Sequence, residues 1–147
     1  GKYFFIPAPL YADTPEDKAM WVQHKVYQRV TERALRADVA FVGIGEVMPG
    51  CPLNAEGFIT DAQVEALNAR GVAGEMLGHF FNQQGERVWG ETDELLTSVH
   101  LESQTQRKII GFAGSERKYP AIRAALQGGW VSGLVTDEDT ALKLLET

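Results

Sequence analysis

Lys118 is the residue whose position most suggests binding chemistry. It lies four residues beyond Gly114, where an apolar run breaks and an alanine-rich, helix-prone segment follows. Backbone N–H groups and the helix dipole favour an anion at a helix N-terminus, and a lysine ammonium would add a positive charge there. The alternative is an ordinary solvated lysine beside Arg117. The segment is not a P-loop, because the spacing G-x-x-x-x-G-K-[ST] is absent.

Glu75 is the second candidate, because it interrupts the otherwise apolar segment AGEMLG between Gly74 and Met76. A carboxylate in such a place is costly unless it is exposed or satisfied by hydrogen bonds. In a cleft it could accept hydrogen bonds from two sugar hydroxyls at once. The alternative is a glutamate at an edge or on the surface, and the residues alone do not decide between the two.

The other polar candidates carry weaker signals. Asp137 directly follows an apolar run and could face a ligand, but the pattern Thr136-x-x-Asp139 also starts helices, and helix capping explains it better. Gly43 and Gly45 end another apolar run, where a glycine pair alone is weak support for a ligand.

No catalytic or metal-binding pattern is recognisable in the sequence. Cys51 lies in a loop without a histidine nearby in sequence, and His24, His79 and His100 have no metal-ligand spacing with one another or with it. We therefore predict no catalytic residue, no metal and no cofactor.

A βαβ unit is predicted to position Lys118 and Asp137. Ile109 to Phe112 is expected to be a buried strand, followed by a helix that ends at Gly128-Gly129 and a strand from Gly133 to Val135. Such crossovers are right-handed, and ligands bind beyond the carboxyl ends of the strands. Residues 114–118 and 136–138 both lie at those ends.

Further elements precede this unit. Lys2 to Ile6 is predicted to be a short strand, and Thr14-Pro15 to start a helix reaching Leu35 or Arg36 with Val22, Val26 and Val30 on its apolar stripe. Residues 38–45 are predicted to form a strand, and Thr60 to Gln63 a capping box. Alternating strands and helices favour a three-layer α/β/α sandwich with a mainly parallel sheet.

Composition limits the classes of protein. The chain has 147 residues, 44% of them hydrophobic, with a formal net charge of −6, which disfavours nucleic-acid binding by this chain alone. No apolar run approaches the roughly 20 residues of a membrane span. One cysteine allows no internal disulfide and fits a reducing cytoplasm.

Three segments occur in a characteristic order: DVAFVGIGEV, ARGVAGEMLGHFFNQQG and IIGFAGSERKYPAIRAALQGGWVSGLVTDEDTALKLL. Together they resemble the sugar-binding effector domain of SorC-type transcriptional regulators, over nearly the whole chain from YFFIPAPLYAD onward. The resemblance implies a fold similar to ribose-phosphate isomerases, glucosamine-phosphate deaminases and CoA transferases. It also implies binding of a sugar or sugar phosphate.

The resemblance also implies roles for individual residues. The family's A-G-G-x-x-K pattern falls on residues 113–118, so Gly114 and Ser115 belong to the ligand loop and Lys118 reaches the ligand. Glu75 takes the acidic position of the family's G-[DE]-x-x-G segment, which contacts sugar hydroxyls. Ser115 departs from the family's second glycine, and Asn82 stands where the family often has aspartate.

The family's early glycine- and threonine-rich phosphate loop and its helix-turn-helix do not occur in this sequence. We therefore expect residues 1–147 to be a single domain that forms part of a larger effector domain. The expected function is ligand sensing, with a sugar or sugar phosphate modulating DNA binding by the attached helix-turn-helix in a cytoplasmic homo-oligomer. The alternative is a sugar-phosphate isomerase or deaminase on the same fold, which would need a general base and a group that polarises a carbonyl.

Overall fold

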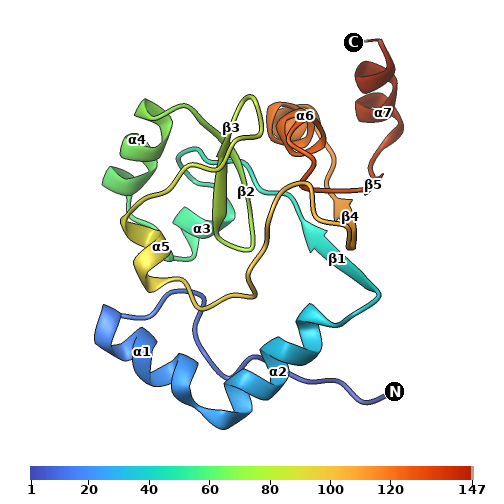
Figure 1. The fold of residues 1–147 in the computed structure, drawn as a ribbon. Coiled ribbons are helices and arrows are strands. Elements are labelled where there is room, and N and C mark those ends of the chain that lie inside the picture. The colour runs from blue at the N-terminus through green and yellow to red at the C-terminus, as the bar shows by residue number, and fades with distance from the viewer. Residues whose placement is uncertain (147) are drawn as a thin grey trace.

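A three-stranded parallel sheet forms the centre of the molecule, which we describe from a computed structural model for residues 1–146 (Figure 1). Its strand order is β1 (Val39–Gly43), β4 (Lys108–Phe112), β5 (Gly133–Val135). The register pairs Phe41 with Ile110, and Phe112 with Val135. The three predicted strands and their adjacency are confirmed, as are the α/β class and the parallel sheet.

The connection from β4 to β5 contains one turn of 3₁₀ helix, η1 (Glu116–Lys118), and the helix α6 (Tyr119–Gln127). Lys118 therefore lies immediately before α6. The helix ends at Gly128, and Gly129 has a φ of +68°, the left-handed conformation that commonly terminates helices. The predicted stop at this glycine pair is confirmed.

An antiparallel hairpin lies beside the parallel sheet. It consists of β2 (Val72–Met76) and β3 (His79–Asn82), joined by Leu77 and Gly78, which both have positive φ. Positive φ at both central residues is the pattern of a tight hairpin turn whose twist matches that of the strands. The sequence did not lead us to expect this hairpin, because leucine rarely adopts this conformation.

The N-terminal helix differs from its prediction, because it is broken at His24 into α1 (Pro15–Gln23) and α2 (Lys25–Leu35). Thr14 caps α1 as expected, and the His24 ring accepts a hydrogen bond from the backbone N–H of Val26 at 3.3 Å, which starts α2. The break changes which face of the second helix points inward. Val26 is 48% exposed, whereas Tyr27 and Val30 are buried, so the predicted valine stripe is wrong beyond the break.

Four further helices complete the described chain: α3 (Pro52–Ala55), α4 (Asp61–Ala69), α5 (Glu91–Leu95) and α7 (Glu138–Leu145). The capping box predicted at Thr60 and Gln63 is present at the start of α4. None of the helices among residues 1–146 combines the length and the apolar character needed to cross a bilayer.

Residues Lys2 to Ile6 form no strand, so that prediction is wrong. Tyr3 is 80% exposed and Phe5 76% exposed, and the Arg33 guanidinium lies over the Phe4 ring at 4.3 Å. The segment has the composition of a strand, but it pairs with no strand edge among the described residues. A strand is stable only with a partner that takes up its backbone hydrogen bonds.

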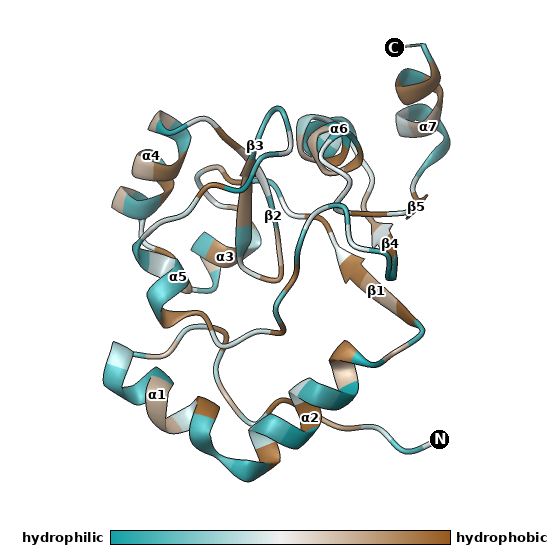
Figure 2. Ribbon diagram, viewed as in Figure 1, coloured by the Kyte–Doolittle hydropathy of each residue, from teal (hydrophilic) through white to brown (hydrophobic). Residues whose placement is uncertain are grey.

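Two apolar clusters make up the core. One lies between α6 and one face of the parallel sheet, and the other joins α4 to the hairpin. On the opposite face of the sheet, Phe41 and Phe112 meet edge to face at 5.8 Å and are 66% and 45% exposed. Figure 2 shows the hydrophobic character of β1, which contributes to both faces. The chain after β1 thus emerges at the border of the two clusters.

Candidate functional site

A cavity of about 310 Å³ opens at the carboxyl end of β1. The end of β1, the hairpin turn and the loop before α6 all contribute to its walls. Glu75 and Lys118, the two principal candidates from the sequence, both line it. Its full lining is Leu10, Gly43, Ile44, Gly45, Glu46, Pro52, Leu53, Glu75, Leu77, Gly78 and Lys118.

Backbone pairing with the end of β1 places Glu75 in this cavity. The Gly45 N–H donates to the Glu75 carbonyl at 2.9 Å, and the Glu75 N–H donates to the Gly45 carbonyl at 2.9 Å. This pair ties the hairpin to the sheet. Gly45 also leaves space for the carboxylate, because a Cβ at this position would lie well inside van der Waals contact with Glu75 Oε1.

The Glu75 carboxyl is largely enclosed and only partly satisfied by the protein. Its Oε2 accepts a hydrogen bond from the Gly78 N–H at 3.0 Å. Burial raises the pKa of Glu75, the Gly78 hydrogen bond and the Lys118 charge oppose this shift, and Glu46 adds to it. Glu75 thus retains the capacity to accept hydrogen bonds from a ligand that enters the cavity.

Lys118 reaches the same cavity from the other side. Its Nζ donates to the Ile44 carbonyl at 3.1 Å and lies 3.7 Å from Glu46 Oε2. An ammonium has three N–H donors, so contact with one carbonyl leaves capacity for a ligand. The contact with Ile44 also fixes the loop before α6 against the end of β1.

Glu46 is the residue that reasoning from the sequence missed. Its side chain is 6% exposed and lies between two cations: Arg117 Nη2 is 2.5 Å from Oε1, and Lys118 Nζ is 3.7 Å from Oε2. Among the described residues, no donor meets hydrogen-bond geometry with either Glu46 oxygen. The signal in the sequence was a glutamate directly after the glycines that end β1, which is hard to tell from an ordinary solvated glutamate.

Ser115 lies in a different cavity from Glu75 and Lys118. That cavity has a volume of about 410 Å³, and Tyr119, Asp137 and Lys143 also line it. Gly114 lies against Asp137, whose Oδ2 would be in severe contact with any Cβ at position 114. The ligand roles of Gly114 and Ser115 stay predictions.

Asp137 is the N-cap of α7, so the prediction of a capping role is confirmed. Its Oδ1 accepts from the Thr140 N–H at 2.8 Å, and its Oδ2 accepts from the Thr140 hydroxyl at 3.0 Å and from the Ser115 N–H at 2.7 Å. These bonds lower the pKa of Asp137. Asp137 therefore holds together the loops that follow β4 and β5.

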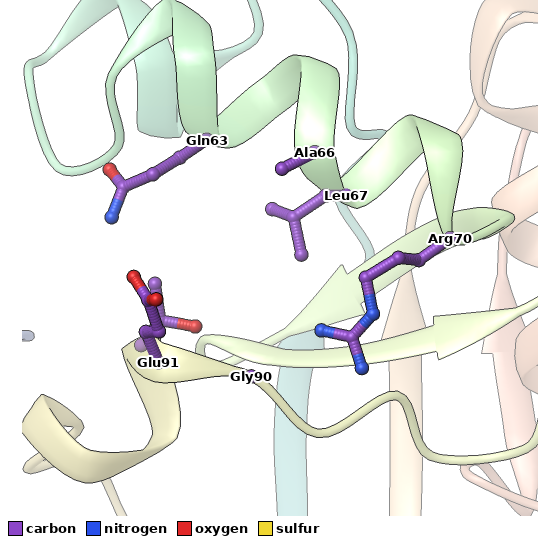
Figure 3. Close-up of a pocket in the computed structure, with 7 residues that line it drawn as sticks. Gln63, Ala66, Leu67, Arg70, Gly90 and Glu91 are labelled. Carbon is purple, nitrogen blue, oxygen red and sulfur yellow. The ribbon is translucent and has the colours of Figure 1, made fainter.

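A further cavity, of about 270 Å³, lies between α4 and the start of α5 (Figure 3). Gln63 and Arg70 reach toward it from α4, and Glu91 reaches toward it from α5. Gln63 Oε1 is already engaged with the Thr60 N–H at 2.8 Å as part of the capping box. This cavity is away from the carboxyl ends of the parallel strands, where ligands of open α/β sheets bind.

A parallel α/β sheet with carboxylates and a lysine converging at its carboxyl edge defines a small-molecule-binding domain. Residues 1–146 match the Sugar-bind family, described as "Putative sugar-binding domain", and the chain belongs to this family. The erythritol catabolism regulatory protein EryD of Brucella abortus is 37% identical over 142 residues, which cover 97% of this chain and 45% of EryD. The transcriptional regulator LsrR of an Enterobacter species is 37% identical over 144 residues, covering 95% of this chain and 45% of LsrR.

A solved structure gives the same assignment. The full-length sorbitol operon regulator SorC from Klebsiella pneumoniae superposes with a TM-score of 0.83 at 30% identity, over 92% of this chain and 45% of SorC. The resemblance to SorC-type regulators is thereby confirmed. The chain spans about half the length of the curated relatives that it matches.

Proposed function

We propose that this chain is the ligand-sensing part of a transcriptional regulator, in which a sugar or sugar phosphate modulates DNA binding by an attached helix-turn-helix. The observation that carries the proposal is the convergence of Glu75 and Lys118 on one cavity in a member of a sugar-binding family. Glu75 would accept hydrogen bonds from sugar hydroxyls, and Lys118 would donate to an anionic or polar group.

Regulation requires that the ligand bind two states of the protein with different affinity. Lys118 supports such coupling, because one side chain links the loop before α6 to the end of β1 through the Ile44 carbonyl. A ligand that attracts Lys118 would compete with this link. We infer that the resulting shift acts on packing between subunits of a homo-oligomer, and that the protein works in the cytoplasm, where the bound DNA lies.

The enzyme alternative has one observation in its favour, which is that the cavity holds a second carboxylate, Glu46. Against it, Glu46 is held between two cations, and His24, His79 and His100 all lie outside the cavity lining. The similar proteins are transcriptional regulators. We therefore expect no turnover of sugar phosphates by the intact protein. Isomerisation or deamination that is lost in Glu75→Gln would instead establish the enzyme function.

The test is a screen of sugars and sugar phosphates by thermal shift on the intact protein, followed by calorimetry on variants. Lys118→Ala should weaken binding roughly tenfold to a hundredfold, because it removes a charge-assisted hydrogen bond. Lys118→Arg should rescue binding only in part, since a planar guanidinium does not replace a compact ammonium.

Lys25→Ala is the matched control, because Lys25 is exposed at the start of α2 and does not line the cavity. It should bind as the unaltered protein does. Unchanged affinity in both Glu75→Ala and Lys118→Ala would contradict the proposed site.

A further inference from the structure

The burial of Glu46 carries an inference about the chemistry of the ligand. A glutamate with a side chain 6% exposed is costly to maintain in a fold unless its charge is compensated. Compensation here comes from Arg117 and Lys118, but neither makes a hydrogen bond of good geometry to it. Both carboxylate oxygens thus line a polar cavity with acceptor capacity that the protein does not use.

The charges that line the cavity are unbalanced toward the negative. Glu46 and Glu75 both line it, and Lys118 is the single lysine or arginine in its lining. Arg117 pairs with Glu46, but its own side chain is 56% exposed and lies outside the lining. An incoming phosphate would therefore meet two carboxylates and a lysine that is already close to one of them. Like charges at such short range repel strongly in a partly desolvated site.

An uncharged polyol matches the same groups well. Two neighbouring hydroxyls can donate to the carboxylates of Glu46 and Glu75, and the oxygen of either can accept from the Lys118 ammonium. We infer that Glu46 makes this cavity selective for an uncharged polyhydroxyl group and against a phosphate. The inference rests on the proposed sugar-sensing function and specifies which class of ligand the cavity accepts.

Calorimetry on the intact protein tests this selectivity with erythritol, xylitol and sorbitol, each compared with its terminal monophosphate. The quantity of interest is the ratio of the two dissociation constants within each pair. The unaltered protein should bind at least one polyol more tightly than its monophosphate. Glu46→Gln should lower this preference by roughly tenfold or more, because it removes one negative charge and keeps the shape of the side chain.

Two further variants keep the test decisive. Glu116→Gln removes the same charge from a side chain that is 90% exposed and outside the cavity, so it should leave the preference unchanged. Arg117→Gln removes the outer partner of Glu46, so the preference for the polyol should increase. This variant also provides a result if Glu46→Gln fails to fold.

Two outcomes would overturn the inference: a tighter fit of the monophosphates in the unaltered protein, or the same ratio in Glu46→Gln and Glu116→Gln. The failure of the proposed function itself looks different. In that case no sugar, polyol or phosphate ester produces a binding signal with the unaltered protein.

Discussion

Glu75 and Asp137 are both acidic residues beside a glycine at the edge of the sheet, yet the protein treats them in opposite ways. Asp137 accepts three hydrogen bonds from Ser115 and Thr140, whereas Glu75 accepts one side-chain hydrogen bond, from Gly78. The pKa of Asp137 is lowered by these bonds, and the pKa of Glu75 is raised by burial. One carboxylate is satisfied by its own chain, and the other is enclosed in a cavity without being satisfied.

The difference separates a structural role from a binding role. Asp137 stabilises the start of α7 and joins two loops, so its charge is used within the fold. Glu75 is desolvated at a cost that the protein recovers only in part, which is typical of residues arranged for a ligand. The same distinction applies to Glu46, whose burial is compensated by charge but not by hydrogen bonds.

The largest expected effect is on ligand affinity when the two carboxylates are removed in turn. Glu75→Ala should weaken sugar binding roughly tenfold to a hundredfold, because hydrogen bonds to a charged acceptor are lost. Asp137→Ala should leave affinity nearly unchanged and lower the hydrogen-exchange protection of α7 amides, because the helix loses its N-cap. Calorimetry and exchange measurements on the intact protein distinguish the two. Equal loss of affinity in both variants would break the comparison.

A matched pair of glycine substitutions should sharpen the comparison. A Cβ at Gly45 would displace the Glu75 carboxylate, and a Cβ at Gly114 would displace that of Asp137. Gly45→Ala should weaken sugar binding by about tenfold with little change in α7, since the displaced group faces the cavity. Gly114→Ala should instead reduce the protection of α7 amides.

The outcome that contradicts this pair is an exchange of effects, with Gly114→Ala weakening binding and Gly45→Ala loosening α7. Gly43→Ala is the control, because a Cβ there would meet nothing within 4 Å. It should change neither measurement.

The sequence predicted the parts of the fold that depend on local pattern. The strands at residues 39–43, 108–112 and 133–135 are apolar runs with clear boundaries, and Thr60 and Gln63 form a cap from neighbouring residues. Glu46 could not be found in this way. Its burial depends on Arg117 and Lys118, which come from a distant part of the chain.

The missed elements have the same explanation. The break at His24 depends on a weak capping contact made by a histidine ring, and the hairpin turn places Leu77 in a conformation that leucine rarely adopts. The segment Lys2 to Ile6 has the residues of a strand but pairs with no strand edge among residues 1–146. Tertiary partners decided each case.

The two carboxylates should also respond oppositely to pH. Because the pKa of Glu75 is raised above its ordinary value of 4.5, its ionisation destabilises the fold as pH rises through the folded pKa. Glu75→Gln should therefore gain stability relative to the unaltered protein above about pH 4.5 and match it below. Urea unfolding of the intact protein between pH 3.5 and 7 measures this, with exposed Glu65→Gln as the control.

Asp137 should show the reverse dependence. Its pKa is lowered below 3.8, so the stability it provides is present above that pH and is lost as pH falls through the folded pKa. Asp137→Asn should thus be less stable than the unaltered protein at neutral pH and should approach it in acid. Parallel curves for Glu75→Gln and Asp137→Asn would show that the two carboxylates are not in different environments.

The smallest expected effect concerns Ser115, which donates its N–H to Asp137 while its backbone has a φ of +95° and a ψ of 150°. Only glycine adopts this region without strain, and such strain costs on the order of 1–3 kcal/mol. Ser115→Gly removes the strain but gives the unfolded chain more freedom, which costs about 0.4–1 kcal/mol. We therefore expect a net gain of about 1 kcal/mol in the free energy of unfolding, measured by urea unfolding of the intact protein.

Ser115→Ala is the matched control for this gain. It removes the hydroxyl and keeps the Cβ, so the strain remains and stability should not rise. If Ser115→Gly is neutral or destabilising, the Asp137 network does not hold Ser115 in a strained conformation. If Ser115→Gly also weakens sugar binding while Ser115→Ala does not, the loop conformation contributes to the ligand site, and the separation between the Asp137 and Glu75 regions would no longer hold.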